Sequence, residues 1–308
     1  MLRHVINAQQ FNVKLIQDLF TRADELQKLT NSKRSFHRLG NILSDRMMFL
    51  LFFEPSTRTR ISFSAAGQHL GMKLVTAENA RESSSSVKGE SLEDAIRVLC
   101  QYKPDIIVLR HYEVDSAKRA SKVSDVPIIN AGDGHGQHPT QALLDLYTIQ
   151  RENGRLNNLT VVLGTDLKHS RSVRSLSYLL AKYPNNHLIF VSPKELRIGQ
   201  DIKTYLKKHD TSYEETDNIE KALTKADVVY WNRIQKERFT SDIPPQTFII
   251  GEEQLKMLKP KASLLNPLPR IDEITKAVDV DPRAAYFRQA GNGMFVRMAL
   301  IEWVLDIL

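Results

Sequence analysis

The stretch Leu50-Leu51-Phe52-Phe53-Glu54-Pro55-Ser56-Thr57-Arg58-Thr59-Arg60 joins an apolar run to three hydroxyls and two arginines. The run over 47–53 has no polar residue and no alternation, which is typical of a parallel strand covered on both faces. The hydroxyl residues that follow are types that begin a helix. Free N–H groups at a helix N-terminus, next to two arginines, predict a site for an anion such as phosphate. The alternative at this point is an ordinary strand-to-helix turn with two solvated arginines.

The composition is that of a soluble globular protein with room for two domains. The chain has 308 residues, 42% hydrophobic and 26% charged, and no apolar run approaches the roughly 20 residues of a membrane span. The start of the sequence lacks the features of a secretory signal, so we expect a cytoplasmic protein. The single Cys100 argues against an internal disulfide and a multi-cysteine zinc site. The net charge of +7 could indicate nucleic acid as partner, but the basic residues are scattered, and small anionic substrates explain the charge equally well.

Segments that suit strands alternate with segments that suit helices along the chain. This alternation predicts βαβ units, and hence an α/β protein with doubly wound parallel sheets. It restarts after a long helix near 138–152, so we expect two such domains, over 1–137 and 138–289, joined by two interdomain helices. A final apolar helix, Met294–Leu308 after Gly291-Asn292-Gly293, is expected to pack back on the first domain, which therefore also takes 290–308. The predicted strands are 47–53, 72–76, 106–109, 126–129, 159–164, 187–191, 228–231 and 263–265, and the predicted helices are 12–29, 61–66, 92–102, 116–123, 138–152, 172–182, 202–208, 219–226 and 294–308.

Polar segments follow the predicted strands, where open α/β sheets bind their ligands. Five of these segments carry an arginine, namely Arg58, Arg110, Arg171, Arg233 and Arg270. One arginine after a strand is an ordinary surface residue. Five of them, with His138 and Gln141 nearby, indicate a ligand with several anionic groups.

Motifs for cofactor and metal chemistry are missing from the sequence. There is no Gly-x-Gly-x-x-Gly, no Gly-x-x-x-x-Gly-Lys-Ser/Thr and no Gly-x-Ser-x-Gly. His135 and His138 have no third metal ligand nearby in sequence. We therefore expect no cofactor and no metal, and a chemistry that depends on positioning and charge.

The segment 78–91 is too polar for a core and too rich in serine for a stable helix. A loop of this length inside a compact domain is either functional or a flexible connection, and the residues alone leave both readings open.

Several longer motifs occur in order along nearly the whole chain. They are Phe53-Glu54-Pro55-Ser56-Thr57-Arg58-Thr59-Arg60, Lys88-Gly89-Glu90, Asn130-Ala131-Gly132-Asp133-Gly134, His138-Pro139-Thr140-Gln141, Arg233-Ile234-Gln235-Lys236-Glu237-Arg238, Pro267-Leu268-Pro269-Arg270 and Gln289-Ala290-Gly291-Asn292-Gly293. Together these motifs resemble the catalytic chains of aspartate carbamoyltransferases, within the aspartate/ornithine carbamoyltransferase superfamily. Ornithine members carry a His-Cys-Leu-Pro element, whereas Pro267-Leu268-Pro269-Arg270 and the motif over 233–238 point to aspartate as acceptor.

The resemblance implies that the amine of L-aspartate attacks the carbonyl carbon of carbamoyl phosphate. The products are N-carbamoyl-L-aspartate and phosphate, a step of de novo pyrimidine (UMP) biosynthesis. The first predicted domain then binds carbamoyl phosphate and the second binds aspartate. By motif position, the carbamoyl-phosphate residues are Ser56, Thr57, Arg58, Thr59, Ser84, Arg110, His138, Gln141, Pro267 and Leu268, the aspartate residues are Lys88, Arg171, Arg233 and Gln235, and the catalytic set is Arg58, Thr59, Lys88, Arg110, His138 and Gln141.

The resemblance also implies a homotrimer whose active sites are shared between chains, because Ser84 and Lys88 lie on a segment that closes over a neighbouring chain's site in the family. Two trimers joined to regulatory chains are an arrangement that the sequence leaves open. No nucleic-acid or membrane partner is expected.

Four positions depart from the family pattern, and they leave room for alternatives. The departures are Asn266 for His, Arg174 for His, Asn232 for Thr and Val87 for a basic residue. One alternative is a carbamoyltransferase for another amino acid, which an acceptor screen would reveal. The other is a non-catalytic or nucleic-acid-binding paralogue.

Overall fold

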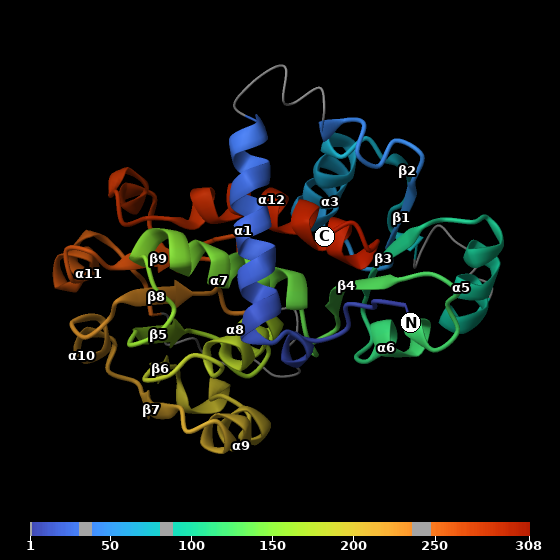
Figure 1. Ribbon diagram of the computed structural model, residues 1–308. Coiled ribbons are helices and arrows are strands. Elements are labelled where there is room, and N and C mark those ends of the chain that lie inside the picture. Colours follow the sequence, from blue (N-terminus) through green and yellow to red (C-terminus); the bar gives the residue numbers. More distant parts are fainter. Residues whose placement is uncertain (1, 31–38, 81–88, 236–247) are drawn as a thin grey trace. The chain divides into compact units, whose positions relative to one another are not determined.

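The computed structural model describes residues 2–30, 39–80, 89–235 and 248–308. The chain divides into two compact units, with Met1–Thr140 and Gly293–Leu308 in unit 1 and Gln141–Asn292 in unit 2. Helices α7 (Pro139–Asn153) and α12 (Tyr286–Val304) each contain residues of both units (Figure 1). The predicted α/β class, with two parallel sheets and two helices shared between the domains, is confirmed.

Unit 1 is built on a four-stranded parallel sheet in the order β2-β1-β3-β4. The strands are β1 (Met47–Phe52), β2 (Lys73–Ala77), β3 (Ile106–His111) and β4 (Ile128–Asp133). The helices of this unit are η1 (Ala8–Gln10), α1 (Val13–Thr30), α3 (Thr57–His69), α5 (Leu92–Gln101) and α6 (Ser116–Ser121). The central strand β1 is apolar throughout because it is buried on both faces.

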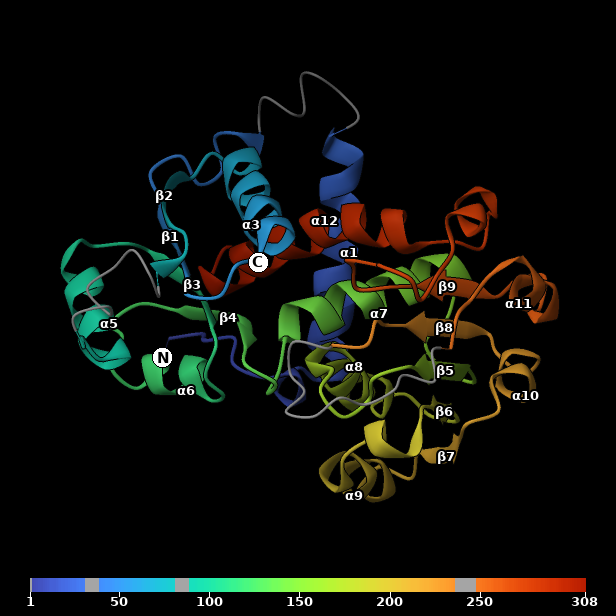
Figure 2. The same ribbon diagram turned by 180° about the vertical axis from the view of Figure 1, so that it is seen from behind.

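Unit 2 repeats this plan with a five-stranded parallel sheet in the order β7-β6-β5-β8-β9 (Figure 2). The strands are β5 (Thr160–Gly164), β6 (His187–Val191), β7 (Ser212–Thr216), β8 (Val228–Trp231) and β9 (Ser263–Leu265). Between and after them lie α8 (Arg171–Leu180), η3 (Lys194–Leu196), α9 (Gln200–Lys208), α10 (Ile219–Leu223), α11 (Glu252–Met257) and η5 (Lys276–Val280).

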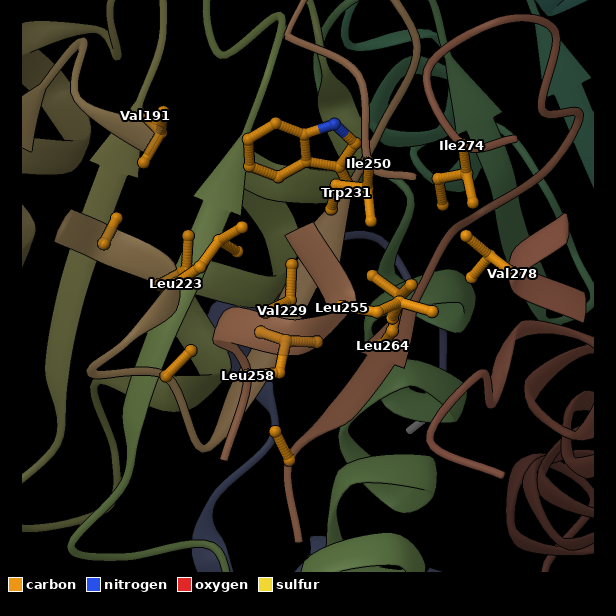
Figure 3. Close-up of a cluster of buried hydrophobic side chains, with 14 of the residues drawn as sticks. Val191, Leu223, Val229, Trp231, Ile250, Leu255, Leu258, Leu264, Ile274 and Val278 are labelled. Carbon is orange, nitrogen blue, oxygen red and sulfur yellow. The ribbon is translucent and has the colours of Figure 1, made fainter. Parts of the chain in front are cut away.

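Each unit has a hydrophobic core of its own. In unit 1, β1 and β3 contribute Phe49, Leu51 and Ile107 to a buried cluster. In unit 2, Trp231 lies in a cluster with Val229 and Ile250 (Figure 3). The Trp231 indole is fully buried, and its Nε1 donates to the Phe248 carbonyl oxygen at 3.0 Å.

The last residues of the chain pack within unit 1. Glu302 of α12 is almost fully buried and accepts from Arg22 Nε at 2.7 Å and from Arg22 Nη2 at 3.0 Å. Arg297 Nη1 donates to the Ser62 hydroxyl at 2.7 Å. These contacts join α12 to α1 and α3.

Three of the differences between predicted and observed elements have a clear physical reason. Strand β4 continues to Asp133, because Asn130 satisfies its polar groups within the fold, donating to the Ile6 carbonyl and accepting from the Gly132 N–H, both at 2.8 Å. Helix α12 begins at Tyr286 and runs through Gly291-Asn292-Gly293, because packing of its apolar residues outweighs the low helix propensity of glycine. Strand β7 was not predicted, because its Ser-Tyr-Glu-Glu-Thr sequence is polar at the sheet edge.

Among the residues that the structure describes, every helix is too short or too polar to span a lipid bilayer.

Candidate active site

In unit 1, the sheet order places the carboxyl ends of β1 and β3 next to each other, at the point where the strand order reverses. Phe52 pairs with Arg110 across these strands, and the Phe53 N–H donates to the Arg110 carbonyl oxygen at 2.8 Å. Ligands of doubly wound sheets bind at such switch points. The predicted phosphate segment over 56–59 follows one of these strand ends, and Arg110 lies at the other.

Helix α3 begins at Thr57, directly after Ser56 as its N-cap residue. In the part of the chain that the structure describes, the Ser56 hydroxyl caps no backbone N–H of this helix. The Arg60 N–H is paired with the Ser56 carbonyl at 3.1 Å, so the N–H groups over 57–59 belong to the first turn, ahead of this hydrogen bond. Thr59 is buried, whereas Thr57 and Arg58 are exposed. The turn can therefore offer hydroxyl and N–H donors to an anion.

Arg110 is buried, and neighbouring groups hold its guanidinium. Its Nη2 donates to Glu54 Oε1 at 2.5 Å, and its Nη1 donates to the Ala131 carbonyl oxygen at 3.2 Å. Glu54 was not among the predicted site residues. Its role as the partner of Arg110 has no local signal, since the two residues are 56 positions apart.

The loop after β4 is a tight hydrogen-bonded turn that leads to His138. Asp133 Oδ1 accepts the Gln137 N–H at 2.6 Å, and the Asp133 carbonyl oxygen accepts the Gly136 N–H at 2.8 Å. Gly134 has a φ of 50°, and a Cβ there would lie 2.6 Å from the Tyr112 carbonyl oxygen. His138 is buried, and its Nδ1 lies 3.4 Å from the Thr140 hydroxyl. The motif over 130–134 therefore shapes the turn that carries His138.

His111 follows Arg110 at the same edge of the sheet. Its Nδ1 accepts the Glu113 N–H at 3.1 Å, and burial lowers the pKa of its imidazole. Its ring therefore favours the neutral form more than an exposed histidine does.

Unit 2 has its own switch point, between β5 and β8. Gly164 pairs with Trp231, and the Asn232 N–H donates to the Gly164 carbonyl oxygen at 2.6 Å. Arg171 is the first residue of α8 and is buried, and Arg233 is partly buried just after β8. This edge therefore carries two arginines, which suits a ligand with two carboxylates.

Buried polar groups join the two segments that carry these arginines. Asn232 Nδ2 donates to the Asp166 carbonyl oxygen at 3.0 Å, and the Gln235 N–H donates to Asp166 Oδ2 at 3.1 Å. Asn232, which departs from the family pattern, therefore connects the two segments by a side-chain hydrogen bond. Asp166 was not among the predicted site residues, although its position directly after a strand is the signal that could have found it.

Strand β9 lies beside β8, and Pro267 and Leu268 follow its end, both partly buried. Leu268 has a φ of 52°, and the Leu268–Pro269 peptide bond is cis. The Leu268 N–H donates to Asn266 Oδ1 at 2.6 Å. This turn therefore lies at the same sheet edge of unit 2 as Arg171 and Arg233.

The fifth arginine, Arg270, is ion-paired within unit 2, and its place among the ligand arginines stays a prediction. Its guanidinium pairs with the Asp279 carboxylate, with Nη2 at 2.6 Å from Oδ2, and Nη1 is 2.9 Å from the Tyr286 hydroxyl. It also lies over the Tyr286 ring, 5.2 Å from the ring centroid. Hydrogen bonding from Arg270 lowers the pKa of Asp279. Its charge is therefore compensated within unit 2.

The other predicted site residues are placed as follows. Gln141 is the first residue of unit 2 and lies in α7. Ser84 and Lys88, like Val87 and the motif residues 236–238, lie outside the described residues. No group of three His, Cys, Asp or Glu side chains within 2–30, 39–80, 89–235 and 248–308 could hold a metal ion. Thr59, Arg110 and His138 lie at or after the carboxyl ends of β1, β3 and β4, which belong to one parallel sheet of unit 1.

Two α/β units, each with arginines at the switch point of a parallel sheet, define a class of proteins suited to anionic substrates. The family profile described as "Aspartate/ornithine carbamoyltransferase, carbamoyl-P binding domain" matches residues 3–151. The profile described as "Aspartate/ornithine carbamoyltransferase, Asp/Orn binding domain" matches residues 157–304. The chain belongs to the aspartate/ornithine carbamoyltransferase family.

Relatives with assigned functions are similar over the full length of the chain. The chloroplastic aspartate carbamoyltransferase of Arabidopsis thaliana is 47% identical over 99% of this chain and 78% of that protein. The aspartate carbamoyltransferase catalytic subunit of Clostridium novyi (strain NT) is 43% identical over 99% of this chain and 98% of its own length. A crystal structure of aspartate transcarbamoylase from Trypanosoma cruzi, in complex with carbamoyl aspartate and phosphate, has a TM-score of 0.88 at 38% identity and covers 97% of this chain and 94% of that one.

Proposed function

We propose that this chain is an aspartate carbamoyltransferase. It transfers the carbamoyl group of carbamoyl phosphate to the amine of L-aspartate, giving N-carbamoyl-L-aspartate and phosphate for pyrimidine synthesis. The observation that carries the proposal is the pair of switch points, one in each unit, with the N-terminus of α3 after β1 and two arginines after β5 and β8. The full-length relatives and the T. cruzi complex support it.

Unit 1 supplies groups for carbamoyl phosphate. Ser56, Thr57, Arg58 and Thr59 hold the phosphate together with Arg110, and Ser84 joins them from the polar segment. Thr59, Arg110 and His138 donate to the carbonyl oxygen when it becomes an oxyanion in the tetrahedral intermediate. Losing one such donor typically costs about 10²–10³ in rate. The Arg110–Glu54 ion pair supports this role, because it aligns the guanidinium in advance.

Unit 2 supplies groups for the carbamoyl NH2 and for aspartate. Gln141 and the carbonyls of Pro267 and Leu268 accept hydrogen bonds from the carbamoyl NH2. Arg171 pairs with the α-carboxylate, and Arg233 with Gln235 binds the β-carboxylate. Lys88, from the polar segment of the first domain, contributes to aspartate binding. The amine nitrogen bonds to the carbonyl carbon, and the bond from that carbon to the phosphate oxygen breaks. The phosphate leaves with the electron pair and takes up the proton that the amine loses.

An acceptor screen tests this function. Purified protein with carbamoyl phosphate and L-aspartate should form N-carbamoyl-L-aspartate, while L-ornithine in parallel should give no citrulline. Turnover of ornithine without turnover of aspartate would contradict the proposal. Binding of DNA or RNA with a steep salt dependence, and no turnover of any acceptor, would favour a paralogue without this activity, which the relatives do not support.

We also propose that the protein is a homotrimer with shared sites. Arg58→Ala alters the pocket and Lys88→Ala alters the segment donated by a neighbour, so each homotrimer should be almost inactive. Random reassembly gives about three mixed trimers in four, each with one intact site in three, so roughly a quarter of all sites should recover. No recovery in the mixture would show that sites are not shared. The native mass gives the number of chains and reveals any regulatory partner. The cytoplasmic location remains a prediction.

A further inference from the structure

A buried carboxylate lies one helical turn beyond Gln141 in α7. Asp145 is fully buried. Its Oδ1 accepts hydrogen bonds from Gln141 Nε2 at 2.8 Å and Gln289 Nε2 at 2.6 Å, and its Oδ2 accepts from the Tyr230 hydroxyl at 2.8 Å. Burial and the charge of Asp145 raise the pKa of Tyr230, which therefore remains a hydroxyl donor. Asp145 thus contacts a predicted site residue on one side and the start of α12 on the other.

The orientation of each side-chain amide in this network follows from a backbone group. The Asn266 N–H can only donate, and it donates to Gln289 Oε1 at 3.0 Å. The Gln289 NH2 must then face Asp145 Oδ1, which accepts it. The same carboxylate oxygen also faces the Gln141 amide, so the NH2 of Gln141 points to Asp145. The Oε1 atom of Gln141 is therefore left on the side away from Asp145, as an acceptor.

Asn266 orients a second predicted site segment in the same way. Its Oδ1 must accept the Leu268 N–H, at 2.6 Å, because that group is also an obligate donor. Its Nδ2 then donates to the Trp231 carbonyl oxygen at 2.7 Å and to Glu273 Oε1 at 2.8 Å. Asn266, a departure from the family pattern, thus joins the Leu268 turn to the end of β8. One connected network therefore links Gln141 and Leu268, the two proposed acceptors for the carbamoyl NH2.

We propose that Asp145 is a positioning residue that holds the Gln141 amide with its oxygen towards the carbamoyl NH2. The proposal rests on the function assigned above. An amide in the opposite orientation presents its NH2 to the NH2 of the substrate, so two donors face each other and the hydrogen bond is lost. Asp145 acts only through Gln141 and touches no substrate. Its effect must therefore disappear when the Gln141 amide is absent.

A double-mutant cycle in the full-length protein tests this dependence. The variants are Asp145→Leu, which removes both acceptor oxygens at similar volume, Gln141→Ala and the two combined. We expect kcat to fall about 10²-fold in each single variant, the range for a misplaced orienting group. The combined variant should lie within about threefold of Gln141→Ala, because interacting residues are not additive. Inorganic phosphate has no NH2, so its Kd by calorimetry should match the wild type in all three.

Thr148→Val is the matched control. Thr148 is another buried polar residue of α7, and its hydroxyl donates to the Leu144 carbonyl at 2.8 Å and accepts from Asn292 Nδ2 at 3.0 Å. This variant should lower Tm and leave kcat unchanged. If Asp145→Leu does not fold, Gln289→Ala takes its place, because it removes one donor to Asp145 and retains the carboxylate. It should lower kcat about tenfold, and only when Gln141 is present.

The outcomes separate this proposal from the function on which it rests. Wild-type protein without N-carbamoyl-L-aspartate formation would refute the proposed function. An active wild type with an Asp145→Leu variant of equal kcat would refute the positioning role alone. Equal losses from the Asp145 or Gln289 change with and without the Gln141 amide, or a weakened phosphate Kd, would assign the network a purely structural role.

Discussion

Gly164→Ala should disturb both the core of unit 2 and the predicted aspartate site, because Gly164 lies against Trp231. A Cβ at this position would lie 2.4 Å from Trp231 Cζ3 and 2.8 Å from Cε3 and Cη2. The indole is fully buried among core side chains (Figure 3). Its Nε1 is held by the Phe248 carbonyl oxygen at 3.0 Å. The ring therefore cannot move without displacing the backbone of β8.

The size of the effect follows from this geometry. Ordinary contact begins at 3.4 Å, so the ring and the new methyl group must separate by about 1 Å. Overpacking of this kind costs about 1–3 kcal/mol, and about 2 kcal/mol lowers Tm by about 4–8 °C for a unit of this size. Arg233 lies two residues after Trp231 in the chain, so a shift of β8 also moves Arg233. A displacement of about 1 Å at a substrate-positioning group lowers the rate about 10²-fold.

Calorimetry and steady-state kinetics measure the two effects separately. The matched control is Gly291→Ala, since a Cβ there meets nothing within 4 Å and the residue lies inside α12. That variant should gain up to about 1 kcal/mol of stability from helix propensity and keep its kcat/KM for aspartate. If Gly164→Ala behaved like Gly291→Ala in both measurements, the close approach of Gly164 and Trp231 would have no energetic consequence and the argument would be wrong.

Four further changes have defined outcomes. Arg58→Ala should lower kcat far more than it raises KM for aspartate, and a change in KM alone would make Arg58 a uniform-binding residue. Arg233→Ala should reduce kcat/KM for aspartate by a factor equivalent to about 2–4 kcal/mol of transition-state stabilisation. Unchanged aspartate kinetics would show that Arg233 does not bind the acceptor. Arg22→Met removes the ion-pair partner of Glu302, whose side chain is only 1% exposed. Urea denaturation should show that the free energy of unfolding falls by about 3 kcal/mol. Adding Glu302→Leu should restore most of it, because no unpaired charge is then buried. Burial lowers the pKa of His111 in the folded protein. As pH falls below about 6.5, the unfolded chain therefore takes up this proton before the folded protein does, and the folded protein loses stability. In His111→Gln the dependence of stability on pH between 7 and 5 should be flatter, and an unchanged slope would contradict a lowered pKa at His111.

Most of the fold could be predicted from the sequence because parallel strands buried on both faces are apolar throughout. Segments such as Met47–Phe53 have a composition that no exposed element can carry. The failures fall where tertiary contacts outweigh local pattern. Ser212–Thr216 is polar and becomes a strand because β6 offers it a ladder of hydrogen bonds. Helix α12 continues through Gly291 and Gly293 because burial of its apolar residues exceeds the cost of two glycines.

The candidate site was predictable in its residue types and less so in their roles. Hydroxyls and arginines after strands indicate an anion site, because strand ends at a switch point converge. The same signal included Arg270, whose position after a strand is equivalent, and only the structure shows its contacts with Asp279 and Tyr286. Glu54 had no such signal, since its partner Arg110 comes from another strand.

What the sequence by itself determined is the class of the protein. The alternation of apolar and amphipathic segments specifies two parallel sheets, and the residues after the strands specify a chemistry of anions, because both depend on local composition. Only the tertiary structure decided which side chains form hydrogen bonds with one another. Asp145 and Gln289 are 144 positions apart, yet they share a hydrogen bond. That contact exists because the two helices carrying them pack in unit 2, and the orientation of the Gln141 amide follows from a backbone N–H at Asn266 that no local pattern connects to it.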